Sequence, residues 1–314
     1  MSFFTDLVGV CSIVGIWPRF IEPYILKTTK LNWSLDAAHR HLEGFTIAQI
    51  SDLHFNKKTS QKFLDKIVRR LLRQKPDVIL FTGDFLCHSH FEDENRLKNF
   101  LNRLHAPQGS YCVLGNHDYS SYVSMNPQGV FDLMKRPKPT MAMIRGFKAL
   151  MRTEKITYSV SDQARSLLPH PNLLKLLAQT PFTLLENATV TLPAGLNITG
   201  LGEYSVDRCR PKTAFAGYDK RYPGIVMSHN PDTFSKLASY PGEWILSGHT
   251  HGEQIHLPFL PYLSKKLVRL EFQTYTRGLH QREGKKHYIT HGVGAPKPFR
   301  FCSFPEIVII KGSI

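Results

Sequence analysis

The sequence predicts a layered α/β fold, and two observations lead to this prediction. Five apolar, strand-like runs recur along the 314 residues, and amphipathic helical patterns lie between some of them. The runs are continuously apolar rather than alternating, which is typical of strands that are covered on both faces. Strands that alternate with helices along a chain indicate a sheet with helices packed on its surface.

The N-terminal part of the chain, residues 1–44, is expected to be an amphipathic, membrane-associating segment followed by a lead-in. Residues 7–17 are apolar but too few to cross a bilayer, which takes about 20 residues. On a helix, one face would carry Phe3, Phe4, Leu7, Val8, Cys11 and Val14. Pro18 is expected to end this helix. A helix in the membrane interface fits the pattern, and so does a terminal helix packed on the domain.

Each of the five strand-like runs stops at a residue that can bind a metal. The runs are residues 46–51, 78–83, 111–115, 225–228 and 244–248, and the residues after them are Asp52, Asp84, Asn116, His229 and His249. Ligands of open α/β sheets bind beyond the carboxyl ends of the strands. We therefore expect these five side chains to point into one crevice.

Two helices are predicted between the first three strands. Residues 60–74 have an apolar face opposite a basic face and end before Pro76, which disfavours helical backbone in the residue that precedes it. Ser89 and Glu92 have the spacing of a capping box, which predicts that a second helix begins there and continues to Leu104.

The amino-acid composition indicates which classes of molecule this protein is expected to bind. The chain has 40 Lys and Arg against 25 Asp and Glu, and a net charge of +15 favours nucleic acid, an acidic lipid surface or a phosphorylated substrate. The five cysteines are scattered and contain no Cys-x-x-Cys, which argues against disulfides and against a thiolate zinc site. The basic residues show no nucleic-acid-binding motif, so binding to nucleic acid is the less favoured interpretation.

The polar residues at the strand ends indicate a metal site. Besides the five named above, the candidate ligands include His54 and His251, which makes seven. Imidazole, carboxylate and amide oxygen without thiolate suit Mn²⁺, Fe²⁺ or Zn²⁺. Seven ligands are too many for one ion and suit two ions, which in such sites lie about 3.5–4 Å apart and act on phosphorus.

The five motifs together resemble those of the calcineurin-like metallophosphoesterases over residues 45–312. They are Asp52-Leu-His54, Gly83-Asp84, Gly115-Asn-His-Asp118, Ser228-His229 and Gly248-His-Thr-His251. The resemblance implies a four-layer sandwich of two mixed β-sheets flanked by helices. It also implies that one ion is held by Asp52, His54, Asp84 and His251, and the other by Asp84, Asn116, His229 and His249. His117 would be the general acid or charge stabiliser, and Asp118 would orient its imidazole.

Residues 248–257, 288–294 and 304–310 narrow the resemblance to the YaeI-type branch of this family. That branch includes enzymes that cleave the pyrophosphate bond of UDP-2,3-diacylglucosamine in lipid A synthesis. It implies UMP and 2,3-diacylglucosamine 1-phosphate as products, Mn²⁺ as the most suitable metal, and a peripheral position on the cytoplasmic face of the inner membrane. Members usually carry glycine where this chain has Glu253. A phosphodiesterase or phosphatase acting on another nucleotide or phospholipid would use the same metal ligands.

The catalytic domain is expected over residues 45–314, with a helical insertion at about 119–168. A helix from about residue 140 would place a Met-rich apolar arc opposite a basic face. As a lid over the metal crevice, this helix would contact substrate through Arg145, Phe147, Lys148, Met151 and Arg152. The alternative is a helix that packs on the domain and leaves its basic residues in water.

Overall fold

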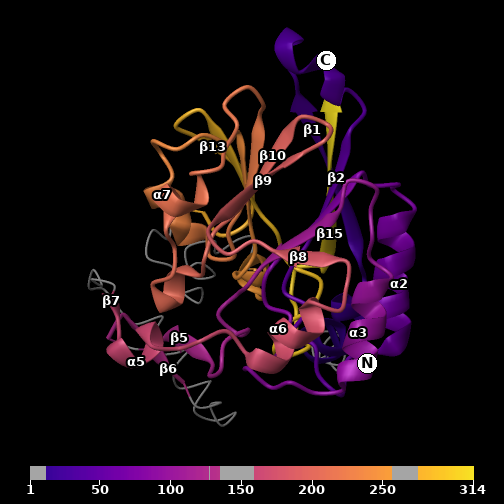
Figure 1. Ribbon diagram of the computed structural model, residues 1–314. Coiled ribbons are helices and arrows are strands. Elements are labelled where there is room, and N and C mark those ends of the chain that lie inside the picture. Colours follow the sequence, from indigo (N-terminus) through magenta and orange to yellow (C-terminus); the bar gives the residue numbers. More distant parts are fainter. Residues whose placement is uncertain (1–11, 127, 135–158, 257–274) are drawn as a thin grey trace.

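The computed structural model describes residues 12–126, 128–134, 159–256 and 275–314 and contains two six-stranded mixed sheets, which pack face to face (Figure 1). Across the first sheet the strands are β1 (Lys27–Ser34), β15 (Glu306–Ser313), β2 (Thr46–Ile50), β3 (Val78–Thr82), β4 (Ser110–Val113) and β8 (Phe182–Leu184). Across the second they are β13 (Gly278–Arg282), β14 (Lys285–Ile289), β12 (Trp244–Ser247), β11 (Gly224–Met227), β10 (Leu196–Gly200) and β9 (Ala188–Leu192). In the first sheet β2 to β8 run parallel, and in the second β10 to β14 do.

The central strands are apolar on both faces because each separates two layers of core. In β3, Val78 and Leu80 pack in the core between the two sheets, while Ile79 and Phe81 pack under the helices of the first sheet. Val226 of β11 lies on the outer face of the second sheet. This arrangement accounts for runs that are continuously apolar, and all five predicted strands are present.

Helices cover the outer faces of both sheets, which gives four layers. Against the first sheet lie α2 (Gln61–Leu72), α3 (Glu94–Asn102) and α6 (Pro171–Leu177), and against the second lie α7 (Pro211–Ala214) and η5 (Pro231–Lys236). The shorter elements are η3 (Ala37–Leu42), η4 (Tyr204–Val206) and η6 (His251–Glu253). The layered α/β architecture with two mixed sheets is therefore confirmed.

Helix α3 begins later than the capping-box pattern predicts. The backbone of His88 and Ser89 has positive φ, and the bridge between Cys87 and His90 closes a tight turn there. The helix starts at Glu94, and the Asp93 side chain accepts a hydrogen bond from the Arg96 amide at 3.4 Å. The predicted start at Ser89 is wrong because the residues that follow the strand form a turn instead.

The described ends of the insertion form strands as well as helix. They contain β5 (Val123–Met125), β6 (Val130–Leu133), β7 (Ser159–Val160) and the single turn α5 (Asp162–Arg165). The three strands make a small separate sheet beside the main sandwich (Figure 1). The helix expected from about residue 140 lies outside the described residues, so the helical insertion stays a prediction. The proposed substrate residues Arg145, Phe147, Lys148, Met151 and Arg152 lie outside the described residues.

The N-terminal segment continues into the sandwich. η1 (Ser12–Ile21) is a wide helix that runs through Pro18 rather than ending there, and η2 (Glu22–Tyr24) follows it. Proline has no backbone N–H, so Pro18 leaves one hydrogen bond of this helix unmade. Residues 27–34 of the expected lead-in form β1, parallel to β15. Within the described residues, no helix has the length and apolarity needed to span a bilayer.

Candidate metal centre

The carboxyl ends of strands from both sheets meet at one place, and the predicted ligands gather there. β2, β3 and β4 of the first sheet lead to Asp52, Asp84 and Asn116, while β11 and β12 of the second lead to His229 and His249. The side chains that follow the first-sheet strands are buried. The crevice expected from the sequence is therefore the junction between two sheets rather than the edge of one.

One group of donors comprises Asp52, His54 and His251, whose ligand atoms lie within 4.8 Å of one another. The Nε2 atoms of the two histidines are 3.1 Å apart. Each also lies within reach of Asp52 Oδ1, at 3.9 Å from His54 and 3.8 Å from His251. These three side chains therefore converge on one point.

A second group comprises Asp84, His229 and His249. Asp84 Oδ2 lies 3.2 Å from His229 Nε2, and His249 Nδ1 lies 3.0 Å from Asn116 Oδ1. The same Asp84 Oδ2 is 3.4 Å from His54 Nε2, which belongs to the first group. The Asp84 carboxylate thus lies between the two groups, at the position expected of a bridging ligand.

Backbone geometry directs these side chains inward. Asp52, His54, Asp84, His249 and His251 all have positive φ, a conformation that non-glycine residues rarely adopt and that clusters at functional sites. Glycines allow the loops to approach closely. A Cβ atom at Gly115 would clash with Asp84, and one at Gly248 would clash with Ser51 and Asp52.

Contacts behind the ligands fix which atom faces the centre. His229 Nδ1 is 2.7 Å from the Thr82 carbonyl oxygen, to which it donates, so that Nε2 faces Asp84. Asn116 Nδ2 donates to the Val123 carbonyl at 2.7 Å, which turns its Oδ1 toward the centre. Val123 belongs to β5, so the insertion helps to orient a candidate metal ligand.

Three of the four candidate imidazoles have a lowered pKa, and His229 is the exception: burial opposes its protonation, but Asp84 holds its pKa well above its ordinary value. A cation that binds His229 would replace that proton. Burial lowers the pKa of His249 to about 3 and that of His54 well below its ordinary value, so both rings are neutral at pH 7. Burial opposes ionisation of Asp84, but His229 and His117 hold its pKa well below its ordinary value. Neutral imidazoles and ionised carboxylates are the forms that bind divalent cations. The donor set therefore fits two such ions.

His117 lies beside this set in a shell of aromatic rings. Its ring centroid is 4.5 Å from that of His54, 5.1 Å from that of His88 and 4.3 Å from that of Tyr122. Its Nδ1 accepts a hydrogen bond from the His88 amide at 2.8 Å. In the neutral ring the proton is therefore on Nε2, which lies 4.0 Å from Asp84 Oδ2.

Asp118, expected to orient this imidazole, has different contacts. Its carboxylate accepts hydrogen bonds from the backbone amides of Asp84, Leu86 and Gly115 at 2.8–2.9 Å. These contacts tie the loop after β3 to the loop after β4. The orientation of His117 comes instead from the backbone of the turn at His88. The sequence does not reveal that contact, because a backbone amide leaves no residue-type signal.

Two further contacts of the centre were not predicted. Ser303 Oγ donates to the carbonyl of His251 at 2.6 Å, and the buried Arg300 donates to the carbonyls of Ser303 and His291. The buried carboxylate of Glu253 accepts from Thr276 Oγ1 at 2.5 Å. Glu253 thereby connects the end of the His251 turn to the chain just before β13.

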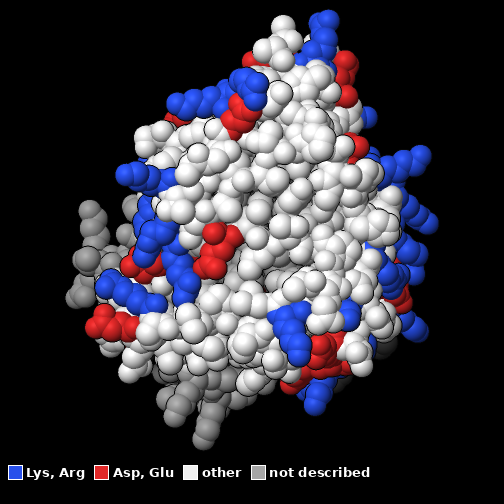
Figure 2. Space-filling view, in the orientation of Figure 1, with Lys and Arg blue, Asp and Glu red and all other residues white. Residues whose placement is uncertain are grey.

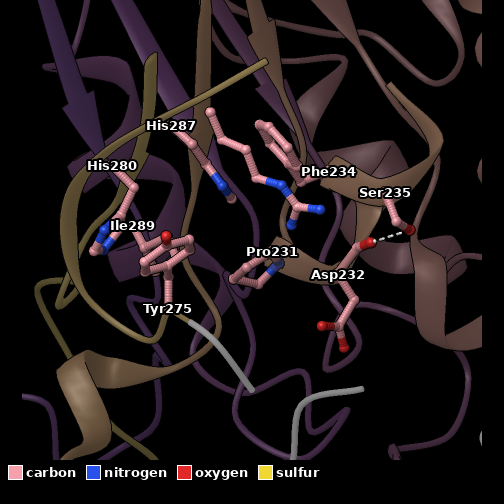
Figure 3. Close-up of a pocket in the computed structure, with 9 residues that line it drawn as sticks. Pro231, Asp232, Phe234, Ser235, Tyr275, His280, His287 and Ile289 are labelled. Atoms are coloured by element: carbon pink, nitrogen blue, oxygen red, sulfur yellow. Dashed lines mark hydrogen bonds between the residues drawn. The ribbon is translucent and has the colours of Figure 1, made fainter. Parts of the chain in front are cut away.

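Two cavities lie near the centre, and their sizes differ greatly. A cleft of about 820 Å³ has His54 and His88 among its lining residues. The second cavity, of about 30 Å³, is lined by aromatic rings: Phe234 stacks on His287, and Tyr275 stacks on His280 (Figure 3). About 10–15 Å³ of such space is enough for one water molecule. Of these two cavities among the described residues, the larger cleft is the one with room for a substrate.

Comparisons with known proteins agree with this geometry. Residues 45–253 match the family described as calcineurin-like phosphoesterases. The chain is 39% identical to the UDP-2,3-diacylglucosamine pyrophosphatase LpxG of Chlamydia trachomatis, over 98% of this chain and 95% of that protein. Identity to LpxG of Chlamydia muridarum is 41% with the same coverage. The phosphodiesterase YaeI of Escherichia coli is 24% identical over 85% of this chain and 82% of its own length.

Proposed function

Because the chain belongs to the calcineurin-like phosphoesterase family, we propose that it hydrolyses the pyrophosphate bond of UDP-2,3-diacylglucosamine. The products are UMP and 2,3-diacylglucosamine 1-phosphate, an intermediate of lipid A biosynthesis. Identity of about 40% to two proteins of that activity, over almost the whole chain, supports the substrate. The observation that carries the reaction class is the convergence of two donor groups on Asp84.

Two divalent cations fit the seven donors, and Mn²⁺ is the ion that we propose. Asp52, His54, Asp84 and His251 would hold one, and Asp84, Asn116, His229 and His249 the other. The chemistry that such a pair supplies is activation of water and neutralisation of charge at phosphorus. Imidazole and oxygen donors without thiolate support Mn²⁺ or Fe²⁺, and Zn²⁺ is a further possibility.

His117 is the proposed catalytic residue beside the metal ligands. Burial lowers its pKa to about 4, so at pH 7 the ring is neutral and its Nε2–H is a hydrogen-bond donor. A departing phosphate has a second pKa near about 6 and needs little proton transfer. His117 therefore acts by donating a hydrogen bond to the phosphate oxygen on which charge develops. Asp118 supports it indirectly, through the loop that carries both residues.

We also propose peripheral association with the cytoplasmic face of the inner membrane. Five large apolar side chains of η1 and η2 are exposed within nine residues, namely Ile16, Trp17, Phe20, Ile21 and Tyr24. An exposed cluster of this kind suits a helix that lies in the membrane interface. Sedimentation with anionic vesicles, weakened in the double variant Phe20→Asp/Ile21→Asp, tests this association.

The charge distribution gives little support to a nucleic-acid-binding protein. On the face in Figure 2, Lys and Arg side chains lie mainly toward the edges, around a broad area without charge. A nucleic-acid-binding protein is expected to gather such residues in one stripe. Binding of nucleic acid also gives no reason for imidazoles and carboxylates to converge at the strand ends.

The test is hydrolysis by the purified chain. UDP-2,3-diacylglucosamine is incubated with the protein and Mn²⁺ in detergent, and products are identified by mass in water labelled with ¹⁸O. We expect UMP and the acylated sugar phosphate, with one product carrying the label. Hydrolysis that survives both strong chelation and Asp84→Asn would overturn the two-metal proposal. Absence of these products, with hydrolysis of another phosphodiester, would overturn the substrate.

A further inference from the structure

The large cleft joins the metal centre to the N-terminal segment. Its volume of about 820 Å³ lies within the range of about 300–1,000 Å³ that is usual for small-molecule sites. At its inner end are His54, a candidate metal ligand, and His88, whose amide holds His117. At its outer end are Phe20 and Tyr24 of η1–η2 and Phe63 of α2. Segments far apart in the sequence thus form its walls.

The outer end is apolar and continues onto the protein surface. Phe20 is 65% exposed and Tyr24 is 42% exposed, so both line the cleft and also face solvent. The ring of Tyr24 packs edge-on against Phe63, with centroids 5.8 Å apart. Trp17 and Ile21, also exposed, extend the apolar surface beyond the cleft. An apolar chain could therefore run from the cleft to a lipid surface along these side chains, with the exposed Arg19 beside Phe20.

The segment η1–η2, which forms the outer wall of the cleft, is hydrogen-bonded to the catalytic domain. Glu22 is fully buried, and its carboxylate accepts hydrogen bonds from the Ser303 amide at 2.6 Å and from Trp17 Nε1 at 2.8 Å. The Arg300 amide donates to the Pro18 carbonyl at 2.7 Å. A buried carboxylate is retained only where such contacts compensate its burial. The wall is therefore part of the folded domain.

Charged and apolar side chains both line the cleft. The exposed cations Arg19, Lys57, Lys58 and Lys297 line it together with Glu92, and the candidate metal ligand His54 lies at the inner end. Cations suit phosphate groups, and the apolar wall suits hydrocarbon. A cleft that combines cations, a candidate metal ligand and an apolar wall matches an amphiphile with a phosphate head and acyl chains.

Resting on the proposed function, we infer that this cleft binds the acyl chains of the substrate. The pyrophosphate lies at the metal ligands. The acyl chains pass along Phe63, Tyr24 and Phe20 and leave toward the membrane over η1. Phe20, Tyr24 and Phe63 are thereby specificity-determining residues, because they distinguish an acylated from a non-acylated nucleotide sugar.

The test compares two substrates that differ only in chain length. UDP-2,3-diacylglucosamine with long chains, and the analogue with four-carbon chains, are hydrolysed with Mn²⁺ by the full chain and by Phe20→Asp and Tyr24→Asp. We expect the ratio of kcat/KM, long over short, to fall about tenfold in each variant, equivalent to about 1.4 kcal/mol. Ile314→Asp is the matched control, because Ile314 is 60% exposed but lies at the end of β15. It should keep the ratio.

The outcomes separate this inference from the proposed function. If the unaltered protein hydrolyses neither substrate, the proposed function itself falls. If it hydrolyses both and the ratio is the same in every variant, only the acyl assignment falls. A photoreactive acyl chain gives an independent measurement: cross-links at Phe20, Tyr24 or Phe63 support the assignment. Cross-links confined to residues 134–155 would overturn it.

Discussion

His117 is the residue for which the structure offers two different roles. Its Nε2 is close enough to His54 and Asp84 that these three side chains form a further group able to hold a metal. Its Nδ1 is engaged by a backbone amide, and its ring is packed against Tyr122 and His88. We interpret it as a hydrogen-bond donor to substrate, since the other seven donors already suffice for two ions.

Substitution of His117 distinguishes these roles. We expect His117→Asn to lower kcat by roughly a hundredfold, the usual contribution of one such group, while KM changes little. The metal content, measured by elemental analysis, should stay at the value of the unaltered chain. Loss of one ion per chain would instead make His117 a metal ligand. Asp65→Asn, at a partly exposed site on α2 where Asp65 pairs with Arg103, serves as the control.

Acid stability depends on His287, which lies outside the metal centre. Burial lowers the pKa of His287 to about 3, whereas in the unfolded chain it titrates near 6.5. Below about pH 6.5 the unfolded state therefore binds a proton that the native state excludes. The free energy of unfolding falls as the pH drops, until about pH 3. Between pH 7 and 5 this group accounts for a loss of about 2 kcal/mol.

Urea unfolding at the two pH values measures this contribution. The loss between pH 7 and pH 5 should be about 2 kcal/mol smaller in His287→Gln than in the unaltered chain, because the other titrating groups are common to both. The exposed His105→Gln should behave like the unaltered chain. An equal loss in His287→Gln would show that the native state accepts the proton.

The sequence predicts the candidate metal ligands better than it predicts the contacts that orient the neighbouring side chains. Asp52, Asp84 and His229 follow apolar runs directly, so residue type and position suffice to predict where they gather. The contact that orients His117 comes from the backbone of His88, in a turn with positive φ. Residue types alone do not separate that turn from the start of a helix, because serine is common in both. Asp118 was therefore given the wrong contacts.

Hydrophobic periodicity predicts the helices and strands that pack inside a layer, but it does not predict the residues at which they begin and end. The helix predicted over residues 60–74 corresponds to α2, because one apolar face packs on the first sheet. Helix α3 begins five residues after its capping-box signal, since Ser89 is used in a turn. The short strands β5 to β7, of two to four residues each, have no periodic signal, so the sequence does not predict them.

The buried carboxylate of Glu22 connects η1 to the catalytic domain, and substitution of Glu22 tests that connection. This carboxylate joins η1 to Ser303, which in turn donates to the carbonyl of His251. Glu22→Gln places an amide donor against Trp17 Nε1, leaving a buried donor without an acceptor. We expect a loss of about 1–3 kcal/mol in the free energy of unfolding, measured in urea. Glu43→Gln, at an exposed site, should cost much less. Equal values would mean that η1 is not part of the cooperative unit.

The whole molecule brings its ligands from two sheets that must pack before the centre exists. Asp52, Asp84 and Asn116 follow strands of the first sheet, and His229 and His249 follow strands of the second. Ions that bind only the folded arrangement stabilise it by mass action, by about 2.7 kcal/mol at a hundred times Kd. Ions bound at the metal centre would therefore hold the two sheets together, and we expect the thermal stability to rise when they are bound.

Thermal unfolding tests this coupling. After removal of metals with a chelator, addition of Mn²⁺ should raise Tm by roughly 4 °C, because an unfolding entropy of about 2.1 cal/mol/K per residue over 314 residues converts about 2.7 kcal/mol into that shift. Asp84→Asn should lose most of the shift, because Asp84 lies between both donor groups. Asp65→Asn should keep it. A shift of the same size in Asp84→Asn would place the stabilising ions elsewhere, since a ligand that belongs to both groups cannot be removed without weakening both sites.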